Sequence, residues 1–142
     1  MSRTPAENNL LARRYFEQIL NDGNFSVADT LLASDFIFRN PPIVAQGVNE
    51  FKTVIDSVRR AFPDLHFTIY DEIAEADKVV IRWTVTGTQR GAFLGHPASG
   101  KTIDVTGINI FRMEGGRIQE IWVNMDRLGE AEQLGWIESP TR

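Results

Sequence analysis

The fold is decided by the stretch GINIFRMEGGRIQEIWVNMD, residues 107–126, which predicts two antiparallel strands joined by a tight turn. Gly115 and Gly116 stand at its centre. A Gly-Gly pair between two runs rich in β-branched and aromatic residues is typical of a two-residue hairpin loop. If these two glycines form the loop, Glu114 faces Arg117 across the turn.

This register decides which side chains share a face of the hairpin. Asn109 faces Trp122. Two residues further along, Gly107 faces Asn124. Because side chains alternate between the faces of a strand, Asp126 continues the same row. The opposite face is apolar in this register and carries Ile108, Ile110, Ile121, Val123 and Met125. Since a sheet that is apolar on both faces must be covered on both, we expect a homodimer through the outer face.

The chain before this hairpin divides into a helical part and a strand part. Thr4, Pro5 and Glu7 have the pattern of a helix start, and apolar residues then recur every four positions up to Asn21. A second long helix is predicted between residues 48 and 62, where apolar residues follow one another at steps of three and four. Short helices are predicted after residue 26 and over 128–134. Strands are predicted over 35–39, 66–73, 78–87, 101–113 and 118–126.

Helices that precede a run of hairpin-joined strands indicate an α+β fold, with the helices on one face of an antiparallel sheet. The length of 142 residues suits one hydrophobic core, so residues 1–142 are expected to form a single domain. The connection over residues 88–100 is long and rich in glycine, and it contains His96. A loop of this length is often functional, and the alternative is an extended hairpin end.

Composition and charge exclude several classes of protein. The chain is 42% hydrophobic and 24% charged, which is typical of a folded globular domain. Its net charge is −4 and it has no basic run, so nothing favours nucleic-acid binding. No apolar run approaches the roughly 20 residues of a membrane helix, and no secretory signal is visible. We therefore expect a cytoplasmic location without membrane contact.

Metal and cofactor chemistry has little support in the sequence. The chain has no cysteine and only two histidines, which excludes a thiolate nucleophile and disfavours a multi-histidine metal site. It also has no phosphate-binding or dinucleotide-binding glycine motif. We therefore expect neither a metal ion nor a cofactor.

Asp126 has the strongest indication of chemistry. It ends a strand whose predicted inner row otherwise holds Trp122 and Asn124. A carboxyl group among aromatic side chains has its charged form disfavoured, which suits general acid/base catalysis. The alternative is that Asp126 only caps the helix predicted to start near Leu128.

Other side chains are candidates for binding a ligand. Asn109 and Asn124 could hydrogen-bond a carbonyl or enol oxygen, or they could satisfy each other or the backbone. Asn40 is either a binding residue or a turn residue before two prolines. The aromatic candidates would line a cavity between helices and sheet, and they are Trp83, Trp122, Phe16, Phe38 and Phe51.

Two stretches in the C-terminal half of the chain resemble the SnoaL-like polyketide cyclases. Residues 82–101, RWTVTGTQRGAFLGHPASGK, resemble the central strand and loop of that family. Residues 107–118, GINIFRMEGGRI, resemble its C-terminal part, as do the later stretches Glu120-Ile121-Trp122, Asp126-Arg127-Leu128-Gly129 and Gln133-Leu134-Gly135. The resemblance extends over nearly the whole chain, from Tyr15-Phe16 to Gly135.

The resemblance implies a strongly curved antiparallel sheet whose N-terminal helices close a cone-shaped pocket. The same fold is found in nuclear transport factor two and ketosteroid isomerase. The resemblance also implies ring closure by intramolecular aldol condensation without a cofactor, with Asp126 as the acid/base. Two departures matter: family members often have histidine where this chain has Asn40, and the predicted inner strands carry no histidine that could assist Asp126.

Three functions follow as hypotheses. In the first, Asp126 removes a proton next to a carbonyl of a small hydrophobic or polyketide-like compound, and Asn124 or Asn109 holds the oxyanion. In the second, the cone binds a hydrophobic ligand without chemistry. The third is epoxide hydrolysis by two carboxylates and an arginine, for which Asp104 is one residue out of register with the inward row.

Overall fold

The first helix begins where the capping residues predict it. The Thr4 hydroxyl accepts a hydrogen bond from the Glu7 amide, and the Glu7 carboxylate accepts one from the Thr4 amide, which closes a capping box before α1 (Pro5–Arg14). The computed structural model describes residues 3–138. In it the helix continues as a π-helical segment over Tyr15–Asn21, and so ends where the sequence predicts.

The remaining helices and strands include one strand, β2, that the sequence does not predict. A 3₁₀ turn (Phe25–Val27) leads into α2 (Ala28–Leu31), and the later helices are α3 (Gly47–Ala61) and α4 (Arg127–Gln133). The strands are β1 (Leu32–Asn40), β2 (Ile43–Gln46), β3 (His66–Glu75), β4 (Lys78–Thr88), β5 (Thr102–Glu114) and β6 (Arg117–Met125). Strand β2 is not predicted from sequence, because it is only four residues long and directly follows Pro41-Pro42.

The six strands form one open sheet in the order β2-β1-β6-β5-β4-β3. All neighbouring pairs are antiparallel except β1 and β6, which run parallel. The sheet is therefore mixed, whereas the sequence predicts an antiparallel one. The reason is that β1 is separated from the other long strands by the α3 crossover, which allows parallel pairing with the last strand.

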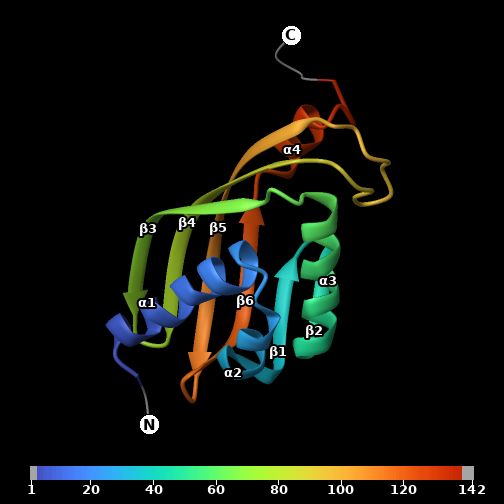
Figure 1. Ribbon diagram of the computed structural model, residues 1–142. Helices are drawn as coiled ribbons and strands as arrows, with labels where there is room; N and C mark the ends of the chain where they lie inside the picture. Colours follow the sequence, from blue (N-terminus) through green and yellow to red (C-terminus); the bar gives the residue numbers. More distant parts are fainter. Residues whose placement is uncertain (1–2, 139–142) are drawn as a thin grey trace.

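The helices gather on one side of the sheet and leave a hollow between the two layers. Figure 1 shows α1 crossing the middle of the sheet, α3 beside β1 and β2, and α4 at the end where the long strands β4 and β5 bend over. This α+β arrangement with helices closing a curved sheet confirms the predicted fold class. None of the helices within residues 3–138 is long and apolar enough to cross a membrane.

The Gly115-Gly116 hairpin is confirmed, but the predicted register beyond it is wrong. Glu114 pairs with Arg117 as predicted. The pairing then shifts by one residue at a bulge next to Gln119. A bulge inserts one extra residue into one strand, so every later side chain of that strand changes face.

This shift corrects the contents of both faces of β6. Asn109 pairs with Val123, and Gly107 pairs with Met125. Ile121, Val123 and Met125 therefore point inward, against the prediction that they lie on the outer face with Ile108 and Ile110. Trp122 and Asn124 point outward, Trp122 half-buried and Asn124 exposed. The shifted register is the more stable one, because it buries branched aliphatic side chains and leaves the Asn124 amide in water.

Candidate functional site

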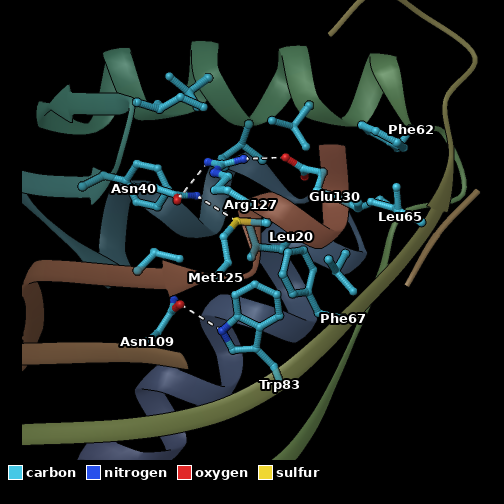
Figure 2. A pocket seen from close by; sticks show the side chains of 18 of the residues that line it. Leu20, Asn40, Phe62, Leu65, Phe67, Trp83, Asn109, Met125, Arg127 and Glu130 are labelled. Carbon is cyan, nitrogen blue, oxygen red and sulfur yellow. Dashed lines mark hydrogen bonds and ion pairs between the residues drawn. The ribbon is translucent and has the colours of Figure 1, made fainter. Parts of the chain in front are cut away.

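A mostly apolar cavity lies between the inner face of the sheet and the helices. Its volume is about 70 Å³. Leu20, Phe62, Leu65 and Phe67 are among the apolar side chains that line it (Figure 2). The polar groups on its wall come from Tyr15, Asn40, Asn109, Arg127 and Glu130. A concave apolar site with a few polar groups is the usual form of a small-molecule site.

One polar group is the buried pair of Asn109 and Trp83 on neighbouring strands. The Trp83 indole N–H donates to Asn109 Oδ1 over 2.9 Å, and both side chains are almost fully buried (Figure 2). Gly107, directly opposite Trp83 across the β4–β5 ladder, makes room for this indole, because a Cβ at Gly107 would overlap the ring. Within residues 3–138, Asn109 Nδ2 has no hydrogen-bond partner, so it remains available as a donor on the cavity wall.

The other polar group is a chain of hydrogen bonds between Asn40, Arg127 and Glu130 (Figure 2). Arg127 donates from Nη2 to Asn40 Oδ1 over 2.9 Å and from Nη1 to Glu130 Oε1 over 3.0 Å. Arg127 Nε also donates to the Pro41 carbonyl over 3.2 Å. Asn40 Nδ2 in turn lies 3.7 Å from Met125 Sδ. The end of β1 and the start of α4 thus hold one carboxylate against one guanidinium at the cavity wall.

Glu130 is the buried carboxylate of the cavity. Its residue exposure is 3%, whereas most carboxylates lie in water. Burial raises the pKa of the Glu130 carboxyl above its ordinary value, and the neighbouring Arg127 guanidinium only partly opposes this. A carboxyl group tuned in this direction suits general acid/base catalysis near neutral pH.

Tyr15 adds a phenol to the same wall. It lies at the junction of α1 and the π-helical segment and is 1% exposed. Burial raises its pKa, so the phenol stays protonated and can donate a hydrogen bond.

Asp126 occupies a different position from the one predicted. Its carboxylate accepts a hydrogen bond from the Gly129 amide over 2.8 Å, so it is the N-cap of α4. The residue is exposed, and the cavity wall next to it is formed by Met125 and Arg127. The capping alternative is therefore confirmed, whereas the catalytic role of Asp126 stays a prediction.

The other predicted site residues divide between cavity, core and surface. Asn40, Phe38, Trp83 and Asn109 line the cavity. Phe16 and Phe51 instead pack in the aromatic core, where both lie against the Tyr15 ring with centroids 5.2 and 5.8 Å away.

Two predicted site residues lie away from the cavity, and so does Asp104, which the sequence places out of register with the inward row. Trp122 and Asn124 face outward because of the bulge in β6. Asp104 is exposed, and its backbone bonds to the side chain of Gln133. The carboxylate pair that epoxide hydrolysis would need is therefore not assembled from Asp104 and Asp126.

Sequence reasoning missed Arg127 and Glu130. A signal exists: Glu130 and Leu134 are four residues apart at the C-terminal helix and are both buried. An acidic residue on the apolar side of a short helix, three residues after an arginine, indicates a paired carboxylate. The hydrogen bond from Arg127 to Asn40 connects residues 87 positions apart, and no local pattern reports it.

A family model for the SnoaL-like polyketide cyclases matches residues 10–134. The chain belongs to this family. Its match covers both layers of the cone, including every polar residue of the cavity wall. Within the described residues, no group of three or more histidine, aspartate or glutamate side chains could hold a metal ion. No curated protein matches the chain.

Solved structures of related proteins share the fold. TsrD from Streptomyces laurentii is 32% identical, with a TM-score of 0.86 over 96% of this chain and 100% of its own. A protein of Jannaschia sp. CCS1, provisionally assigned as a SnoaL-like polyketide cyclase, is 24% identical, with a TM-score of 0.86 over 99% of both chains. IdmH from Streptomyces antibioticus, provisionally assigned as a polyketide cyclase, is 24% identical, with a TM-score of 0.76 over 94% of this chain and 99% of its own.

Proposed function

We propose that this SnoaL-like protein is a cofactor-independent acid/base enzyme that acts on a small, mostly apolar carbonyl compound. Intramolecular aldol ring closure, the chemistry that the family name implies, is the reaction that we favour. The observation that carries the proposal is a buried carboxylate, Glu130, on the wall of an apolar cavity beside Arg127.

Four of the five polar residues on the cavity wall have a role in this reaction. Glu130 removes the proton next to a carbonyl, and the electron pair moves to that carbonyl oxygen to give an enolate. Asn109 Nδ2 donates to the enolate oxygen, since the hydrogen bond from Trp83 fixes the orientation of the Asn109 amide. The enolate carbon then attacks a second carbonyl of the same molecule, and the new alkoxide takes the proton back from Glu130. Arg127 and Asn40 hold the Glu130 carboxylate in place.

Proton removal is tested on a simple ketone, without knowledge of the natural substrate. In D2O the protein should accelerate exchange of the α-hydrogens of cyclohexanone, followed by proton NMR. Glu130→Gln should lower the catalysed rate by at least about 100-fold, the lower range for general-base catalysis. Asp126→Asn is the matched control and should retain the rate, because asparagine also caps helices well.

The opposite results identify the rival functions. Exchange at the wild-type rate in Glu130→Gln, together with a 100-fold loss in Asp126→Asn, would return the catalytic role to Asp126 as the sequence predicts. Binding of cyclohexanone without any accelerated exchange would favour a carrier of hydrophobic ligands.

We also propose that the protein is a homodimer through the outer face of the sheet. An apolar row crosses four neighbouring strands there in register, and its members are Ile73, Val80, Ile110 and Trp122. Charged pairs flank the row, with Arg39 bonded to Glu120 and Arg82 bonded to Asp71. An apolar centre with a tryptophan and a polar rim is the usual composition of a protein interface. The cytoplasmic location stays a prediction from sequence.

A further inference from the structure

The connection between β4 and β5 is held from inside by one buried side chain, Gln89. Gln89 has no exposed surface. Its side-chain Nε2 lies 3.2–3.3 Å from the carbonyl oxygens of Gly91, His96 and Pro97, and its Oε1 accepts a hydrogen bond of 2.7 Å from the Ser99 hydroxyl. A single amide thus bonds to both halves of the loop, so the loop is organised before any ligand binds.

The same loop is attached to the end of α3. The amides of Arg90 and Gly91 both donate to the Ala61 carbonyl, over 2.8 and 3.2 Å. Gly91 allows this approach, because a Cβ there would lie 3.1 Å from the Arg60 carbonyl oxygen. Figure 1 shows the connection running beside the end of α3 and below α4, at one end of the sheet.

At its tip, between Phe93 and His96, the loop forms a tight hairpin that places Phe93 on the cavity wall. Phe93 and His96 exchange two backbone hydrogen bonds of 2.9 Å, around Leu94 and Gly95, which both have positive φ. Phe93 is 8% exposed and lines the cavity, and its ring lies edge-on to Phe62 with centroids 5.2 Å apart.

A second contact fixes the hairpin from outside. The His96 imidazole stacks on the Trp136 indole, with ring centroids 4.0 Å apart and planes 12° apart. Trp136 also lies 6.0 Å from the Phe93 ring. The phenyl ring of Phe93 is thus held between Phe62, the residue directly after α3, and Trp136.

We propose that Phe93 determines the size of the ligand that the cavity accepts, and that Gln89 is the residue that positions it. The proposal rests on the proposed function only in taking this cavity as the ligand site. Removal of the phenyl ring would extend the cavity toward Trp136 and admit a second fused ring. Loss of the Gln89 amide would release the hairpin and so weaken the discrimination between small and large ligands, although Gln89 itself does not contact the ligand.

Two ketones of different size test the role of Phe93. Cyclohexanone has one ring and 1-tetralone has the same ring fused to a benzene. Their dissociation constants are measured by NMR from the indole N–H signal of Trp83, which lines the cavity. Phe93→Ala should shift the ratio of the two constants in favour of 1-tetralone by at least about tenfold, the lower range for discrimination by pocket size. Leu94→Ala, at the exposed tip of the same hairpin, should leave the ratio unchanged.

Gln89→Met tests the positioning role. It keeps the volume of the side chain and removes its hydrogen bonds. The ratio should shift in the same direction as in Phe93→Ala, and the amide hydrogens of Phe93 and His96 should exchange at least about tenfold faster. The amides of β5 serve as an internal control, since global destabilisation would accelerate those too.

The outcomes separate this proposal from the proposed function. An unchanged ratio in Phe93→Ala, or failure of wild type and variant to bind either ketone, overturns the size role. Normal hydrogen exchange in Gln89→Met overturns the positioning role. A shifted ratio in a protein that does not accelerate deuterium exchange would support the size role while the enzymatic proposal fails.

Discussion

At the scale of single residues, the Glu130 carboxyl that we propose as the general base also affects the stability of the fold. Burial raises the pKa of its carboxyl above the ordinary value of 4.5, so the folded protein holds this proton to higher pH than the unfolded chain does. By linkage, its stabilising contribution is complete below the unfolded-state pKa and is lost as pH rises through the folded-state pKa. The wild type should therefore gain stability relative to Glu130→Gln on acidification.

Urea unfolding of the two proteins at several pH values between about pH 8 and about pH 4 measures this, because that range runs from well above the ordinary pKa of the carboxyl to just below it. The difference between the two free energies of unfolding is the relevant quantity, since all other titrating groups are shared. A difference that stays flat, or that favours the wild type at high pH, would contradict the raised pKa.

The sequence predicts the members of the site unevenly at this scale. Asn109 and Trp83 are found because strand alternation places both on the inner face, and alternation is a local property. Glu130 is missed because its neighbour Arg127 is bonded to Asn40, at the far end of another strand. The sequence predicts Asp126 as the catalytic carboxylate instead, because the unshifted hairpin register places it in the inner row. The bulge in β6 changes that register.

At the scale of elements, α4 depends on its cap. It is only seven residues long, and Asp126 satisfies the amide of Gly129 at its start. Asp126→Ala should therefore lower the free energy of unfolding by about 1 kcal/mol, the usual cost of losing an N-cap. Asp126→Asn should cost less than half of this, because its side-chain oxygen still accepts the bond. Urea unfolding of the three proteins is the measurement, and equal losses in both variants would contradict a capping role.

In the hairpin of β5 and β6, local sequence patterns predict the turn but not the bulge. Its turn is predictable because Gly115 and Gly116 both have positive φ, which few other residues adopt. The bulge at Gln119 is not predictable in this way, because no glycine or proline marks it. Burial of apolar side chains decides between the two registers, because the shifted register places Ile121 and Val123 in the core and leaves Trp122 on the outer face.

At the scale of the whole molecule, the sheet separates the face that lines the cavity from an outer face with an apolar row. The inner face provides the wall of the cavity, and the π-helical segment Tyr15–Asn21, α3 and α4 complete it. Figure 1 shows α1 and α3 together on one side of the sheet, and the apolar row lies on the other side. Ile73 and Ile110 are 63% and 38% exposed there. Three of the five residues predicted for the outer face, Ile121, Val123 and Met125, point inward. The reason to expect a partner survives, since Ile108 and Ile110 lie on the outer face as predicted and Trp122 joins them there.

The proposed homodimer gives the last prediction. Ultracentrifugation at micromolar concentration should show about twice the chain mass of 16.0 kDa. Ile110→Lys should give a monomer, because a buried ammonium at the centre of the two-fold interface would meet its own copy without a counter-ion. Leu10→Lys is the matched control: Leu10 is 61% exposed but lies on α1, so this variant should remain a dimer. A wild-type monomer, or dimeric Ile110→Lys, would show that another surface or no surface makes the contact.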